Sequence, residues 1–149
     1  MNSTTRHTLT IGLVAATALA LAACGLLGPS RGDDGRVTET SVIPSKTLLV
    51  GDCFTFVDGS DHAQSTVTPC SQDHAYIVIG QGDLSAAEIS TAGSLQVAVS
   101  GACSDVFAQF KAAAAEGTKP EQEFIVNVET KDGVDTTHYS CVATDAVAA

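Results

Sequence analysis

The chain contains no tryptophan, and only five phenylalanines and two tyrosines are spread over its 149 residues. Large rings bury the most apolar area, so a small domain with few of them needs stabilisation from elsewhere. The chain also lacks the Gly-x-Ser-x-Gly elbow, the glycine-rich phosphate loop and the His-Glu-x-x-His motif. The sequence therefore indicates no particular catalytic reaction.

Basic residues are also scarce. Seven lysines and arginines are outnumbered by 17 acidic residues, which gives a net charge of −10. A surface of this sign repels phosphate backbones, so we expect no nucleic-acid partner. It repels anionic lipid headgroups for the same reason. We therefore expect acyl chains, rather than the domain surface, to make any contact with a membrane.

No apolar stretch approaches the roughly 20 residues that a helix needs to cross a bilayer. The longest, residues 11–23, follows a polar start that carries Arg6. A short basic start and an apolar run of this length are typical of a secretory signal peptide. We therefore predict a signal peptide over residues 1–23, whose removal leaves 126 residues, enough for one domain.

The signal ends in Leu21-Ala22-Ala23-Cys24-Gly25, which has the form of a bacterial lipobox. An aliphatic residue stands three positions before a cysteine, and two small residues suit the narrow subsites of a signal peptidase. We predict that Cys24 is lipidated, with palmitate among its acyl chains, and that it anchors the protein to the extracytoplasmic face of the cell membrane. The alternative is an ordinary secretory signal with Cys24 as a plain thiol.

After the signal, residues 24–45 have almost no aromatic or periodic apolar content and are rich in glycine, serine and threonine, so we interpret them as a flexible tether. We expect the folded domain to cover residues 46–149. Alternating or β-branched patterns predict strands over 48–57, with a break at Gly51-Asp52, and over 65–69, 75–79, 124–129 and 136–142. Gly80 and Gly82 are expected to end the third of these strands.

One helical region separates the strands. Ser85 and Glu88 have the spacing of a capping box, and an interruption is expected near Gly93. Apolar residues then recur every three or four positions as far as Ala113, and Gly117 is expected to end the helix. The pattern predicts an α+β fold: a small disulfide-linked domain with one long helix packed on an antiparallel sheet of about five strands.

The five cysteines are accounted for by one lipidation and two disulfides. Lipidation uses Cys24, and an oxidising envelope pairs the other four. Of three pairings we favour Cys53–Cys70, which flank a predicted hairpin, and Cys103–Cys141, which lie on the apolar stripe of the helix and in the last strand. No Cys-x-x-Cys occurs, so a zinc ribbon or a thioredoxin-like site has no support.

Two segments resemble a known family. Val50-Gly51-Asp52-Cys53-Phe54 and Pro69-Cys70-Ser71-Gln72-Asp73-His74 are similar to motifs of the actinobacterial septum-formation domains, and Cys103 and Cys141 fit the places of two further family cysteines. The resemblance covers about residues 47–142. It implies a role in septum formation and carries over no catalytic residue.

The most suggestive polar pair is Asp73-His74. A histidine beside a carboxylate can act as a general base, with Ser71, Ser140 or water as the nucleophile. We favour a structural role for His74 beside Cys70, then a contact of Asp73 and His74 with a partner, and catalysis last. Three histidines, His62, His74 and His138, lack the paired spacing of a zinc site. We interpret the acidic residues around the last hairpin as a solvated face rather than a calcium site.

These observations leave two classes of function. We expect a non-enzymatic binding module of the cell envelope, without metal or cofactor, whose partner is an envelope or division protein or a component of the cell wall. The alternative is a lipoprotein that holds a small ligand for a transporter or a sensor.

Overall fold

The computed structural model describes residues 28–131 and 133–144. It shows an α+β fold, as predicted, in which six antiparallel strands form one sheet with the order β1-β3-β2-β4-β6-β5. In chain order the elements are β1 (Ser41–Pro44), the short 3-10 helix η1 (Ser45–Thr47), β2 (Cys53–Phe56), β3 (Gln64–Thr68), β4 (Tyr76–Leu84), α1 (Ala86–Ala92), α2 (Leu95–Ala113), β5 (Gln122–Lys131) and β6 (Val134–Thr144).

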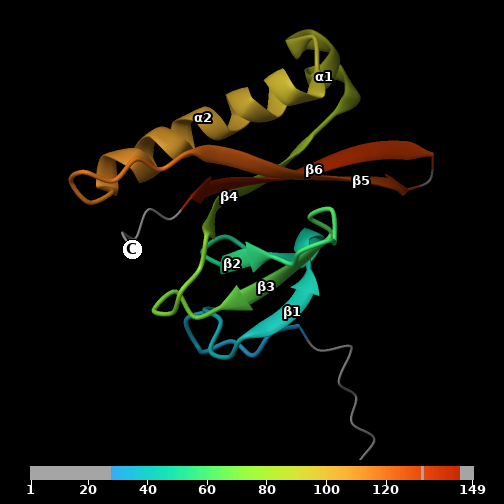
Figure 1. Ribbon diagram of the computed structural model, residues 1–149. Helices are drawn as coiled ribbons and strands as arrows, with labels where there is room; N and C mark the ends of the chain where they lie inside the picture. Colours follow the sequence, from blue (N-terminus) through green and yellow to red (C-terminus); the bar gives the residue numbers. More distant parts are fainter. Residues whose placement is uncertain (1–27, 132, 145–149) are drawn as a thin grey trace, which may run out of the picture.

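Strand β4 joins the two halves of the sheet (Figure 1). Its first residues, Tyr76 and Ile77, pair with β2, whereas its whole length pairs with β6. The register shifts between Val78 and Gly80, and an irregularity of this kind bends a strand. Figure 1 shows the result: β1, β2 and β3 lie on one side of the bend, and α2 crosses the β5–β6 hairpin on the other.

Each half has its own core. The first centres on Phe54, which is fully buried and stacks on Tyr76 with ring centroids 5.5 Å apart. The second lies under α2, where Val99 and Cys103 are fully buried. The favoured disulfides are confirmed: Cys53–Cys70 closes the β2–β3 hairpin, and Cys103–Cys141 links α2 to β6. The cross-links thus tie each core together where large rings are few.

The prediction that Gly80 and Gly82 end a strand is wrong, because β4 continues to Leu84. Both glycines lie on the face that packs under α2. A Cβ atom at Gly80 would lie 3.2 Å from Val106 Cγ1, and one at Gly82 would lie 2.8 Å from Tyr139 Cζ. The lack of a side chain at these glycines therefore lets Val106 and Tyr139 pack closely against the strand, and it does not mark a turn.

The expected boundaries of the helical region are confirmed at its start. The Ser85 hydroxyl accepts from the Glu88 backbone N–H, and the Glu88 carboxylate accepts from Ser85 N–H in return. The left-handed conformation of Gly93 separates α1 from α2. At the other end α2 stops at Ala113, before Gly117, because the next residue is already extended.

The expected flexible tether over residues 24–45 is wrong from Ser30 onward. Arg31 bridges to Val37, and Ser41–Pro44 form β1, which pairs with β3 along the edge of the sheet. Val37 and Ile43 are buried. Isolated apolar residues are therefore enough to hold this segment against the domain once the edge of the sheet is present. The domain therefore begins no later than Ser30, whose carbonyl oxygen accepts from the Thr38 N–H, and thus ahead of the expected Lys46. The earlier residues, including the predicted signal peptide and Cys24, lie outside the described residues.

The strand predicted to start at Leu48 starts later, because only the residues from Cys53 onward are β-structure. Leu49 to Asp52 form a turn closed by a hydrogen bond from Asp52 N–H to Leu49 O, 3.0 Å long. Among the described residues, no helix is long and apolar enough to span a membrane.

Candidate functional site

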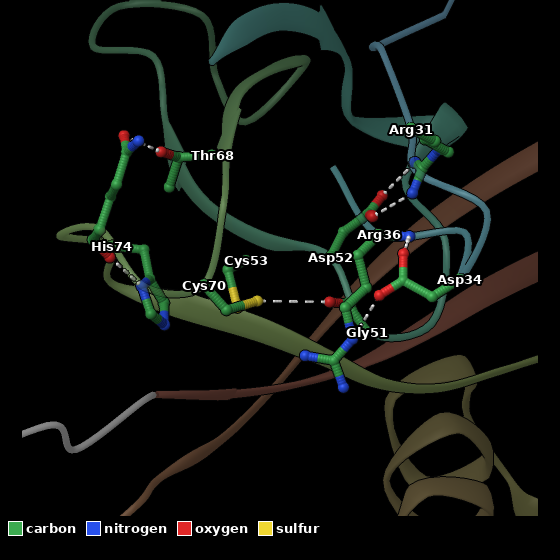
Figure 2. Close-up of a disulfide and its surroundings, with 10 residues drawn as sticks. Arg31, Asp34, Arg36, Gly51, Asp52, Cys53, Thr68, Cys70 and His74 are labelled. Carbon is green, nitrogen blue, oxygen red and sulfur yellow. Dashed lines mark hydrogen bonds and ion pairs between the residues drawn. A yellow bond between two sulfur atoms is a disulfide. The ribbon is translucent and has the colours of Figure 1, made fainter. Parts of the chain in front are cut away.

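The Gly51-Asp52-Cys53-Phe54 motif builds the fold. Gly51 adopts φ of 91°, which favours glycine, and its N–H donates to Val78 O across to β4. Asp52 is buried and accepts a hydrogen bond from the Leu49 N–H. It also accepts two from the Arg31 guanidinium (Figure 2). Each residue of the motif is therefore used inside the domain.

The second motif, residues 69–74, forms a hydrogen-bonded corner beside the Cys53–Cys70 disulfide (Figure 2). The Gln72 side-chain oxygen accepts from the Thr68 hydroxyl at 2.9 Å. His74 Nδ1 lies 2.7 Å from the Gln72 carbonyl oxygen, and since a carbonyl can only accept, Nδ1 donates. The His74 ring is half-buried and Asp73 is exposed. The structural role favoured for His74 fits these contacts, and its role toward a partner stays a prediction.

The three histidines lie in different places. His62 precedes β3 and stacks on Phe56 with ring centroids 4.2 Å apart, His74 precedes β4, and His138 lies in β6. Across residues 28–131 and 133–144, no group of three or more His, Cys, Asp or Glu side chains is placed to hold a metal ion. The zinc alternative therefore gains no support from the fold.

Two adjoining hollows, of about 350 and 500 Å³, lie between the 44–49 segment and the sheet face formed by β4, β5 and β6, and residues 61–63 also line the second hollow. We call them together the groove. Side chains alternate across β5, so Phe124 and Val126 pack under α2 while Ile125 faces the first core and the groove. Both hollows share Lys46, Ile125 and Asn127. Their volumes lie in the range of small-molecule sites, about 300–1,000 Å³.

One wall of the groove is fastened to the sheet by Gln81. Its side-chain amide donates to the Leu48 carbonyl oxygen at 2.8 Å and to the Ser140 hydroxyl at 2.9 Å. Because these bonds join η1 and its following loop to β4 and β6, the groove has a preformed wall.

A polar chain crosses one end of the groove on three neighbouring strands. His138 Nδ1 contacts the Asp83 carboxylate, and His138 Nε2 lies 3.7 Å from a Glu129 carboxylate oxygen. All three side chains are at least two-fifths exposed, so their mutual attraction is screened by water.

The polar groups of Lys46 and Asn127, unlike those of this polar chain, are not paired with other described residues. Neither side chain has a hydrogen bond or an ion pair within the part of the chain that the structure describes. They present one ammonium and one amide toward both hollows, and these groups are available to a bound molecule.

Sequence reasoning missed the groove. Gln81, Asn127 and His138 come from strands whose pairing no local pattern reveals, and the wall that faces them belongs to the presumed tether. The alternation of Ile125, Asn127 and Glu129 was a signal for one face of β5, but not for what stands opposite it. The groove exists only because the sheet bends at β4.

A scan against protein-family models found no match, and searches of curated proteins and of solved structures found none either. The resemblance to septum-formation domains therefore rests on the two motifs and the cysteine positions.

Proposed function

We propose that the protein is a lipid-anchored, non-enzymatic binding module on the extracytoplasmic face of the cell membrane, with a role in septum formation or envelope growth. The lipobox at Cys24 supports the anchor, and the motifs around Cys53 and Cys70 support the role. The two disulfides are consistent with a domain that folds in an oxidising compartment.

The groove carries the proposal of binding. It combines a preformed wall, apolar floor residues such as Ile125, and the uncommitted polar groups of Lys46 and Asn127. A ligand or partner that enters gains apolar contact and new hydrogen bonds without first breaking bonds inside the domain. We therefore assign the groove as the surface for an envelope protein or a cell-wall component.

Side-chain pairing supports a non-enzymatic role. Beside the groove, the Ser140 hydroxyl and the His138 ring have separate partners. The Ser140 hydroxyl is bonded to Gln81, and His138 contacts carboxylates. An activated hydroxyl nucleophile needs a base within hydrogen-bond reach, and Ser140 and His138 do not form such a pair.

The first test removes the two uncommitted groups together. Lys46→Ala with Asn127→Ala should reduce partner capture from membranes and weaken septation, while unfolding stays near that of the wild type. The matched control is Gln109→Ala with Lys111→Ala on the exposed side of α2, which removes the same two chemical groups. Equal capture by both double variants would show that the groove is not the binding surface.

The second test separates binding from catalysis at His74. His74→Ala is first checked for folding and then scored for septation, envelope integrity and partner capture. If the folded variant loses all function while it still captures every wild-type partner, the binding proposal is wrong and a catalytic reaction has to be sought.

The size of the hollows favours one alternative, a small-ligand-binding lipoprotein that serves a transporter or a sensor. Native mass spectrometry of the purified protein distinguishes the two. A small molecule that co-purifies with the wild type, and is lost from the Lys46→Ala, Asn127→Ala variant, would favour the alternative.

A further inference from the structure

Leu49 and Val50 form an exposed apolar tip on the turn before β2. They are 49% and 58% exposed, and they are adjacent in the chain. Single exposed apolar residues are ordinary, and turn tips usually carry polar residues instead. Two large aliphatic side chains at one turn therefore raise the question of what covers them.

The tip is fixed to the start of the domain. One oxygen of the Asp52 carboxylate accepts from the Leu49 N–H at 2.8 Å. The same oxygen accepts from Arg31 Nη2 at 2.8 Å (Figure 2). A single buried carboxylate thus holds the base of the tip and the N-terminal segment together. Wherever Arg31 is held, the tip is held as well.

Chain length places Arg31 near the bilayer. It follows Cys24 by seven residues, which reach at most about 25 Å when fully extended. We propose that, in the anchored protein, the Leu49–Val50 tip rests on the lipid surface and inserts between the headgroups. The inference depends on the proposed lipidation of Cys24.

Local charge fits an apolar contact with zwitterionic lipid. Arg31 is paired with Asp52, and Arg36 lies 3.7 Å from Asp34, so these cations are matched within the domain. The net charge of −10 opposes binding to anionic headgroups. The tip therefore adds an apolar contact to the acyl chains that the sequence alone led us to expect, and this contact should withstand high salt.

The absence of tryptophan provides a clean probe. Val50→Trp, in the full acylated chain, is reconstituted into phosphatidylcholine vesicles that contain brominated lipid. Its emission should shift to the blue and be quenched, also at high salt. The control is Val97→Trp, because Val97 is equally exposed at 58% but lies on α2, which covers the face of the sheet away from the groove (Figure 1). Val50 does not line the groove, so the probe leaves the proposed binding site intact.

Vesicle flotation separates the two proposals. If the wild type fails to float with the vesicles, the anchor itself is wrong. If the protein floats but Val50→Trp is quenched no more than Val97→Trp, the anchor stands and the tip contact is wrong. Adding Arg31→Met to Val50→Trp should reduce quenching while flotation is retained, because the tip is then released from the N-terminal segment.

A second measurement covers the case in which Val50→Trp does not fold. In the wild type, the amides of Leu49 to Gly51 should exchange more slowly on vesicles than in detergent. Protection that occurs in native membranes and is missing on pure lipid vesicles would show that a protein covers the tip, which would overturn the lipid contact.

Discussion

Arg31 and Asp52, 21 positions apart, form a two-pronged ion pair with N–O distances of 2.6 and 2.8 Å. The Asp52 side chain is 1% exposed and that of Arg31 is 20% exposed. The hydrogen bond to Asp52 raises the pKa of Arg31 above its ordinary value, against the opposing effect of burial. The pair is one of the contacts, together with the pairing of β1 with β3, that make residues assigned from sequence to a tether part of the folded domain.

We predict that Arg31→Met lowers the free energy of unfolding by about 3 kcal/mol, because it leaves a buried carboxylate without its cation. Arg36→Met is the control, since the Arg36 side chain is 74% exposed and its pairing is loose. It should change stability by no more than about 0.5 kcal/mol. Denaturant titration measures both, and equal effects would mean that the buried pair does not stabilise the fold.

Two glycine substitutions should change the stability of the domain in opposite directions. Gly82→Ala places a Cβ atom 2.8 Å from Tyr139 Cζ, so the ring must move, and we expect a loss of about 1–3 kcal/mol. Gly101→Ala meets nothing within 4 Å inside α2 and should stabilise by about 0.5–1 kcal/mol. Thermal unfolding reports both changes, and a neutral Gly82→Ala would argue against the close packing of Tyr139 on β4.

Removing a cross-link should cost more stability when the loop that it closes is longer, although the cost grows only with the logarithm of the loop length. The separations are 17 residues for Cys53–Cys70 and 38 for Cys103–Cys141. Loop entropy then gives roughly 3 and 4 kcal/mol. The two double Cys→Ala variants are compared by denaturant unfolding, and peptide mapping without reduction should recover both pairs from the wild type. Any other pairing would contradict the fold.

The start of helix α1 should become less stable at acid pH. Hydrogen bonds from the Ser85 hydroxyl and backbone lower the pKa of Glu88 below its ordinary value. A lowered folded-state pKa stabilises the helix start above the unfolded value of about 4.3, and this contribution is lost as pH falls through the folded pKa. Ser85→Ala should raise the Glu88 pKa in a carboxyl NMR titration, whereas Ser90→Ala in the same helix should leave it unchanged. An unaltered pKa in Ser85→Ala would contradict the capping box.

Local patterns predicted much of the secondary structure. The capping box at Ser85 and the interruption at Gly93 depend on neighbours within a few residues, and the structure confirms both. The disulfides were predicted because the hairpin and the helix stripe brought each pair to one place. By contrast, the end of the third strand was wrong because glycine is also used where another residue packs against the backbone, as Val106 does at Gly80.

The sequence by itself determined what depends on short range and on residue type: the lipobox pattern, the acidic charge, the helix cap and the cysteine pairs. Only the tertiary structure decided where the domain begins, because Arg31 needs Asp52 and β1 needs the free edge of β3. The tertiary structure also formed the groove, because its lining residues, Lys46 and Asn127 among them, are far apart in the sequence. Contacts of this kind depend on how a bent sheet brings distant segments together, and no local period in the sequence encodes that bend.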